Sequence, residues 1–287
     1  MAASPQPKVL LFDIGGVCVV SPFQAILDYE RSLSIPPGWI NYSISRSGPS
    51  GAWHQLERGA IPLDNNFFAS FNADLHRPDN WQAFYDREAA RAGSSLPREM
   101  PPLPRVDGEW LFNEMMRVSQ EPDPWMLPAL KKLRHSGRYI VGALSNTILF
   151  PEGHALYRRE PHVAGGPLRD LFDVFISSAH VGVRKPDERM YNLAVETLDA
   201  FARHNAQTER GAKYGWGDGV RSADILFLDD IGENLKAAKR QGFRTIKVHL
   251  GRTYEAVEEL ERLTGLELQG HHPKIAVEAG IRPESKM

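Results

Sequence analysis

Five short apolar runs along the chain have the pattern of buried strands in a parallel sheet. Each run is continuously apolar rather than alternating, as expected for strands whose two faces are both covered by helices. Helical patterns lie between the later runs, and two of them end near a glycine, which suits a helix C-terminus. This alternation predicts an α/β fold with a doubly wound parallel sheet. The predicted strands are Val9–Phe12, Tyr139–Leu144, Val174–Ile176, Ile225–Leu228 and Thr245–Val248, and the predicted helices are Pro128–His135, Glu188–His204 and Glu233–Gln241.

A long insert separates the first predicted strand from the second. It has apolar positions at helical spacing and holds four of the six tryptophans, most of which we expect to pack inside a small helical unit. We therefore predict an α/β core formed by residues 1–20 and 119–287, with a helical cap formed by residues 21–118. The predicted cap helices are Phe23–Leu33, Ala52–Arg58, Asn66–Leu75, Trp81–Ala92 and Trp110–Val118, and the predicted loops or surface insertions are Gly93–Gly108, Pro151–Gly166 and Asn205–Gly219.

Composition narrows the function classes. The chain has 287 residues with 42% hydrophobic content, enough for a sizeable core, and a net charge of −2. The chain has no excess of basic residues and no polybasic cluster, so its composition does not predict a nucleic-acid or membrane-surface partner. No apolar run approaches the roughly 20 residues that a spanning helix needs. Cys18, the one cysteine, excludes a disulfide framework and a cysteine metal site, which favours a cytoplasmic protein.

The C-terminal tripeptide Ser285-Lys286-Met287 is one substitution from the Ser-Lys-Leu peroxisomal address. A polar tail that ends this way by coincidence is the alternative reading. Peroxisomal targeting is therefore a hypothesis beside the cytoplasmic prediction.

Polar or small residues follow each of the first four predicted strands. In an open parallel sheet, ligands bind beyond the carboxyl ends of the strands, so these residues are expected to meet at one edge. The edge would then hold three carboxylates, one ammonium group, two small polar side chains and a pair of glycines. In strand order they are Asp13, Gly15 and Gly16, then Ser145 and Asn146, then Lys185, then Asp229 and Asp230.

Three carboxylates at one edge repel each other and raise each other's pKa unless a cation lies among them. Oxygen ligands without clustered cysteine or histidine favour Mg²⁺ over zinc. Lys185 offers a compact positive charge to an oxyanion, and the backbone at Gly15 and Gly16 offers close approach and N–H donors to phosphate oxygens. The set fits a phosphoryl group attacked by Asp13 to give an aspartyl-phosphate, which water then hydrolyses.

The order of these motifs resembles the haloacid dehalogenase-like (HAD) hydrolase superfamily. Within it, the layout LSN…VRKPD…FLDD and the segment FLDDIGENLKAAKRQGF are similar to the phosphatase domain that forms the N-terminal half of soluble epoxide hydrolases. The resemblance covers nearly the whole chain, and we expect no epoxide-hydrolysing domain to follow. It implies a HAD-like Rossmannoid core, a mobile cap inserted after the first strand, and a small phosphorylated substrate.

The resemblance also implies roles for individual residues. Asp13 would be both nucleophile and metal ligand, and Gly15 would give a backbone carbonyl to the metal. Asp230 would bind Mg²⁺ directly, with Asp229 beside it or acting through water. Lys185 would bridge Asp13 and the phosphoryl group, which Ser145, Asn146 and the backbone at Gly16 would hold. Apart from the resemblance, Asn234 is expected either to support the site from behind its ligands or to lie on the helix surface, rather than to take part in the chemistry.

Gly15 stands where typical phosphatases of this superfamily have a second aspartate that protonates the leaving group. Three functions stay open: a phosphatase whose leaving group takes its proton from substrate, water or the cap; a catalytically weak binding or regulatory protein; and a dehalogenase, whose halide leaves without a proton. We rank them in that order, because the Asp229-Asp230 pair indicates a metal that dehalogenation does not need. The sequence gives neither the oligomeric state nor the identity of the substrate.

Overall fold

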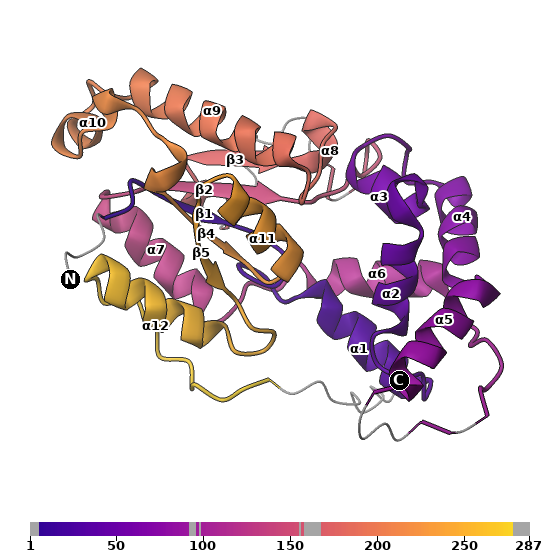
Figure 1. The fold of residues 1–287 in the computed structure, drawn as a ribbon. Helices are drawn as coiled ribbons and strands as arrows, with labels where there is room; N and C mark the ends of the chain where they lie inside the picture. The colour runs from indigo at the N-terminus through magenta and orange to yellow at the C-terminus, as the bar shows by residue number, and fades with distance from the viewer. Residues whose placement is uncertain (1–5, 92–95, 98, 155, 158–167, 278–287) are drawn as a thin grey trace.

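A five-stranded parallel sheet forms the centre of the protein (Figure 1). The computed structural model describes residues 6–91, 96–97, 99–154, 156–157 and 168–277. The strand order β3-β2-β1-β4-β5 confirms the predicted doubly wound topology, and every strand lies within one residue of its predicted bounds at each end. The strands are β1 (Val9–Phe12), β2 (Ile140–Ser145), β3 (Val174–Ser177), β4 (Ile225–Asp229) and β5 (Arg244–Lys247).

The two faces of the sheet pack against different helices (Figure 1). Because side chains alternate along a strand, Leu10 and Phe12 pack on one side, while Val9 and Leu11 pack on the other. The first face is covered by α7 (Met126–Ser136) and α12 (Thr253–Thr264), the second by α9 (Glu188–His204) and α11 (Gly232–Arg240). Both strand faces are therefore dry, which explains the continuous apolar runs in the sequence.

The helical insert after β1 has its own hydrophobic cluster, separate from the two that flank the sheet. Trp39 and Trp81 are buried there with ring centroids 5.0 Å apart, as the sequence led us to expect. Trp110 differs, because half of its surface is exposed and its ring lies against Tyr29. The helices of this insert, called the cap below, are α1 (Pro22–Ser32), α2 (Trp39–Arg46), α3 (Ala52–Glu57), α4 (Asn65–Leu75), α5 (Pro78–Ala89) and α6 (Gly108–Val118).

Several cap helices begin after a serine or an aspartate whose side-chain oxygen accepts a hydrogen bond from the helix. The oxygens of Ser21, Asp64 and Asp107 accept N–H groups of the first turns of α1, α4 and α6, which satisfies donors that lack partners inside the helix. The Ser21 cap is followed directly by Pro22, whose fixed φ suits the first helical position. These local signals set the direction in which the chain enters the cap from the sheet.

Some predicted segments turn out differently or lie outside the described residues. The segment Asn205–Gly219 is not a plain surface insertion: it contains α10 (Glu209–Lys213) and Trp216, which is buried against the sheet-flanking cluster of α9. The short helix α8 (Ser178–Val181) follows β3 directly. Most of the predicted insertion Pro151–Gly166, part of Gly93–Gly108, and the predicted address Ser285-Lys286-Met287 lie outside the described residues. Among the helices that are described, none combines the length and the apolar character needed to cross a membrane.

Candidate active site

Asp13 lies at the end of β1, where the strand order of the sheet reverses. Its backbone N–H donates to the carbonyl of Leu228 on β4 at 2.8 Å, so the ladder between β1 and β4 continues up to this residue. Its carboxylate is buried and accepts the N–H of Ile14 at 2.7 Å. Beyond it the chain turns tightly, with the N–H groups of Val17, Cys18 and Val19 all donating to the carbonyl of Ile14. Strand and turn together hold the Asp13 side chain at the switch point of the sheet, where ligands bind in open α/β folds.

Lys185 reaches Asp13 from the loop that follows α8. Its side chain is fully buried, and its ammonium nitrogen lies 2.9 Å from Asp13 Oδ1 and 2.8 Å from Asp229 Oδ2. Burial acts to lower the pKa of Lys185, but the two carboxylates outweigh it and hold that pKa above its usual value. The ammonium group is therefore a fixed positive charge between the ends of β1 and β4.

Asn146 fixes the backbone that carries this lysine. Its side-chain oxygen accepts the N–H of Lys185 at 2.8 Å, and its amide nitrogen donates to the Lys185 carbonyl at 3.1 Å. The Asn146 side chain, predicted to hold a phosphoryl group, is thus engaged by the lysine loop in this structure. Its predicted contact with phosphate stays a prediction.

Asp229, the last residue of β4, is completely buried and surrounded by donors. One oxygen accepts the Ile231 N–H at 2.7 Å, and Asn234 donates its amide to both oxygens at 3.1 and 3.0 Å. With Lys185 included, both oxygens of Asp229 are in use. Asn234 supports the site in the way expected from the sequence, and Tyr191 in turn donates its hydroxyl to the carbonyl of Asn234 at 2.9 Å.

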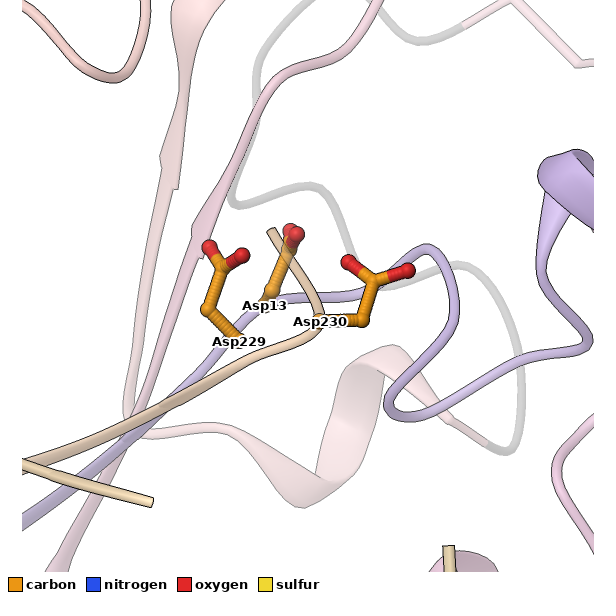
Figure 2. Close-up of side chains that lie close together, drawn as sticks. All are labelled: Asp13, Asp229 and Asp230. Atoms are coloured by element: carbon orange, nitrogen blue, oxygen red, sulfur yellow. The ribbon is translucent and has the colours of Figure 1, made fainter. Parts of the chain in front are cut away.

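Asp230 has the opposite surroundings. Its Oδ1 is buried and has no hydrogen-bond partner among the described residues. Figure 2 shows its carboxyl group pointing the same way as those of Asp13 and Asp229, and oxygens of the three acids lie within 4.8 Å of one another. An unpaired buried carboxylate oxygen is costly, and this one faces two further carboxylates.

The turn after Asp13 makes room for this cluster at Gly16. A Cβ atom at this position would lie 2.3 Å from Asp230 Oδ2, and the backbone φ of +75° also favours glycine. The N–H of Gly16 donates to the Val19 carbonyl at 3.1 Å, so the turn itself uses that donor. The phosphate contact predicted for Gly16 stays a prediction, whereas its lack of a side chain is required by Asp230.

The charges of the cluster do not balance. Burial raises the pKa of Asp13 to about 7, with Lys185 lowering it and Asp229 raising it. Burial also raises the pKa of Asp230 well above its usual value, and repulsion from Asp13 and Asp229 adds to this effect. Three acids face a single lysine, so a divalent cation among them would relieve the repulsion that raises these pKa values.

A cavity of about 600 Å³ opens beside these residues, between the carboxyl edge of the sheet and the cap. Gly15 and Ser145 lie at its core side, together with Asn146, Thr147 and Ser177 from the ends of β2 and β3. Most of the remaining lining is apolar, and it comes from both units. These apolar residues are Ile14, Val19, Pro22, Trp53, Met116, Pro122, Ile148, Leu149, Phe150, Leu156, Leu168 and Phe175.

Glu57 and His180 are two of the lining residues that were not identified from the sequence. Glu57, at the end of cap helix α3, has its Oε2 2.7 Å from Nε of Arg184, the residue before Lys185. His180 of α8 lines the cavity and its Nδ1 lies 2.7 Å from Ser177 Oγ. No spacing or motif in the sequence distinguishes these side chains from ordinary surface residues; Glu57 acquires its position through a contact with a distant part of the chain, and His180 through a local contact after β3.

The chain resembles proteins of known class over most of its length. A phosphatase of Mycobacterium tuberculosis is 30% identical to it over 182 residues, which are 63% of this chain and 70% of that relative. The chain belongs to the HAD-like hydrolase superfamily. The sesquiterpene phosphatase astK of Aspergillus oryzae is 26% identical over 258 residues, 90% of this chain and 97% of that relative. No model of a protein family matches the chain.

Some relatives of this HAD-like hydrolase are much longer. Bifunctional epoxide hydrolase 2 of Sus scrofa is 24% identical over 262 residues, 91% of this chain but only 39% of that relative. A dehalogenase solved with an intermediate complex shares the fold, with a TM-score of 0.50 and 17% identity, over 92% of this chain and 98% of that one. These matches agree with the predicted resemblance to HAD-like enzymes and to epoxide hydrolase sequences.

Proposed function

We propose that this HAD-like hydrolase is a Mg²⁺-dependent phosphatase that cleaves a phosphomonoester through an aspartyl-phosphate on Asp13. The observation that carries the proposal is the grouping at the end of β1. The Asp13 carboxylate has an ammonium group 2.9 Å away and two further acids whose oxygens lie within 4.8 Å. A carboxylate nucleophile beside a fixed cation and a cation-binding site suits attack on an anionic phosphoryl group.

The residues present fit a magnesium ion. The partnerless buried oxygen of Asp230 is the free ligand atom that such a site needs, and Asp13 offers a second. All donors in the cluster are oxygens, as Mg²⁺ prefers. We assign Asp230, Asp13 and the Gly15 carbonyl as direct ligands. Asp229 would hold Lys185 and lie beside the metal site or contact the metal through water. When bound, the ion would neutralise charge on the phosphoryl oxygens.

In the first step an Asp13 oxygen attacks phosphorus, and the bond from phosphorus to the ester oxygen breaks as the new one forms. The departing oxygen takes its proton from water or from the substrate. Lys185 stays charged and faces the transferring group, and Ser145 with the backbone of Asn146 and Gly16 would hold its oxygens. In the second step water attacks the aspartyl-phosphate and releases inorganic phosphate, which restores the Asp13 carboxylate.

The cavity points to a substrate with an apolar body. Its lining is dominated by aliphatic and aromatic side chains from both the core and the cap, and its volume of about 600 Å³ exceeds what a phosphate group fills. The sesquiterpene phosphatase among the relatives, which is similar over 90% of this chain, supports the same direction. In this proposal the cap, residues 21–118, closes over the substrate and excludes water, while the core, residues 1–20 and 119–287, carries the chemistry.

Release of inorganic phosphate tests the proposal. The panel compares short polar phosphomonoesters with phosphomonoesters of long-chain alcohols, each with Mg²⁺ and with EDTA. Asp13→Asn keeps the shape of the side chain but removes the nucleophile, so turnover is expected to fall to background. Asp86→Asn, an exposed aspartate on α5, is the matched control and keeps wild-type turnover. Turnover by Asp13→Asn at the wild-type rate would refute the aspartyl-phosphate mechanism.

The absence of an acid at Gly15 favours one alternative, a binding or regulatory protein with little turnover. General acid–base help is worth about 10²–10⁴-fold, so its loss slows a phosphatase without abolishing its reaction. Phosphomonoester binding by calorimetry, with no phosphate released over many hours at high enzyme concentration, would favour this alternative. Dehalogenation fits less well, because it needs no metal ion, and the buried Asp230 oxygen would then stay without a partner.

A further inference from the structure

Glu57 connects the cap to the core through two different groups. It is the last residue of α3 and is almost fully buried. Its carboxylate oxygen Oε2 lies 2.7 Å from Nε of Arg184, and its backbone carbonyl accepts the hydroxyl of Ser178 at 2.6 Å. One cap residue is therefore attached to both ends of the segment that runs from α8 to the lysine loop.

Both core partners of Glu57 are joined to residues of the candidate active site. Arg184 directly precedes Lys185, whose N–H and carbonyl are held by Asn146. The hydroxyl of Ser178 also accepts the N–H of Thr147, the residue after Asn146, at 2.9 Å. The loops after β2 and β3 are thus linked to each other at Asn146 and to the cap at Glu57.

The backbone on both sides is shaped for this contact. Gly59 has a φ of +63°, and a Cβ atom there would lie 2.4 Å from the carbonyl oxygen of Ala179 in α8. Only glycine allows α3 to end so close to the core. Glu57 itself lines the cavity, so the contact forms where the cap meets the substrate space.

The ion pair is sheltered, because its side chains are only 10% exposed for Glu57 and 23% exposed for Arg184. A pair in such surroundings is not screened like one on an open surface, and removal of either partner leaves the other charge buried without compensation. The pair joins two units with separate hydrophobic clusters, so it forms only when cap and core are together. Its energy is thereby tied to the closed arrangement.

We propose that Glu57 and Arg184 are positioning residues that couple closure of the cap to the placement of Lys185. This inference rests on the proposed phosphatase function for its kinetic consequences, while the coupling itself is a property of the fold. When the cap closes, Glu57 contacts Arg184 and Ser178 at the same time. The loop that carries Lys185 is then held against Asn146, with the Lys185 ammonium group at Asp13. When the contact is broken, the loop loses its support from the cap side.

The kinetic test uses Glu57→Gln, Arg184→Met, the double variant and the charge-conserving Arg184→Lys, with p-nitrophenyl phosphate and Mg²⁺. Because misplacement of a group that touches the reacting phosphoryl is costly, kcat is expected to fall about tenfold or more in each uncharged single variant. The double variant should be no slower than the slower single one, and Arg184→Lys should recover most of the activity. Glu114→Gln, whose carboxylate pairs with Arg117 inside α6, is the matched control and should keep wild-type kcat.

A structural test needs no turnover. Amide hydrogen exchange is measured in segments 52–59 and 178–185, without ligand and with Mg²⁺ plus inorganic phosphate. Glu57→Gln should exchange faster than wild type in both segments, and by a larger factor there than in the sheet strands, whose exchange follows the overall stability. An unchanged kcat in Glu57→Gln, strictly additive single effects, or unchanged exchange in both segments would overturn the proposal. If wild type hydrolyses no phosphomonoester, the proposed function fails, and the exchange result alone decides the coupling.

Discussion

The two adjacent acids at the end of β4 provide a sharp test of the site, because their surroundings are opposite. Asp229 is saturated with donors, whereas Asp230 has a buried oxygen without a partner among the described residues. Replacement of each by asparagine changes one oxygen to an amide group and keeps the size of the side chain. In the absence of metal, the two variants should therefore change stability in different directions.

For Asp229→Asn the cost follows from its contacts. Lys185, Ile231 and Asn234 all donate to this carboxylate, so an NH₂ group in either orientation faces at least one donor. Lys185 also keeps only Asp13 as a counter-charge. Loss of one partner from a buried ion pair costs about 3–5 kcal/mol. The free energy of unfolding should fall by that amount.

For Asp230→Asn the change removes repulsion. Unit charges 4.8 Å apart, the largest separation among these oxygens, repel by about 3.5 kcal/mol at an effective dielectric constant of about 20. Burial and the neighbouring acids raise the pKa of Asp230, so part of this energy is already avoided by proton uptake. The stability of the metal-free variant should equal or exceed that of wild type, by up to about 3 kcal/mol.

Thermal unfolding in EDTA and then in rising Mg²⁺ measures both effects. At roughly 2–4 °C per kcal/mol, Asp229→Asn should lower Tm by about 6 °C or more, while Asp230→Asn leaves it unchanged or higher. Wild type should gain stability with Mg²⁺, and Asp230→Asn should lose most of that gain, because binding to the folded state is what stabilises it. A fall of Tm in EDTA for Asp230→Asn as large as that for Asp229→Asn would refute the assignment of separate roles.

Three further predictions concern other parts of the molecule. Gly16→Ala places a Cβ against Asp230 at a backbone φ of +75°, so the Tm in EDTA should fall, and a metal titration should show at least a tenfold loss of Mg²⁺ affinity. Burial acts to raise the pKa of Asp173, but hydrogen bonds from Arg210, a backbone N–H and Arg134 hold it below its usual range. Asp173→Asn should therefore lose about 3 kcal/mol at neutral pH, and urea unfolding should show the gap to wild type closing as pH falls below about 4. Finally, among substrates of similar size and polarity, turnover should depend steeply on leaving-group pKa, with aryl phosphates preferred to alkyl phosphates and anomeric sugar phosphates preferred to other sugar phosphates; a flat dependence would reveal a proton donor.

The sequence was sufficient to predict the sheet because burial on both faces leaves a strong signal. Residues such as Leu11 and Phe12 point to opposite sides, yet both meet helices, so the run stays apolar throughout. Strand ends were predicted to within one residue, since polar residues begin where the strands leave the core. The sequence predicted a doubly wound sheet but no particular strand order, and the rules for connections between parallel strands allow only a few such orders.

Four of the described α-helices were not predicted, namely α2, α8, α10 and α12, and two of them show different reasons. In α12 the signal is present, with Ala256, Val257 and Leu260 buried at helical spacing, and it could have been identified by extending the periodicity past the last strand. In α2 there is little local signal, because Gly38 precedes a short run rich in β-branched and aromatic residues. The burial of Trp39 against Trp81 decides that segment, and only the tertiary structure supplies it.

The sequence was sufficient to predict which residues meet at the site but not which contacts they make with one another. Strand ends place Asp13, Lys185 and the β4 acids together, as parallel topology requires. The sequence does not show that Asn146 holds the lysine backbone, since a Ser-Asn pair after a strand reads equally well as a turn. The contact between Glu57 and Arg184 joins distant parts of the chain, and neither residue stands in a motif.

Glu57 and His180 line the cavity and are candidates to replace the acid that is missing at Gly15. Glu57 has its Oε2 2.7 Å from Nε of Arg184. His180 lies on α8 after β3, with its Nδ1 2.7 Å from Ser177 Oγ. A general acid must come within about 3.2 Å of the leaving oxygen or act through one water. Glu57 and His180 would each have to leave their present partners and come within that distance, so the slope against leaving-group pKa decides whether the leaving group departs as an anion, takes a proton from water, or is protonated by one of these side chains.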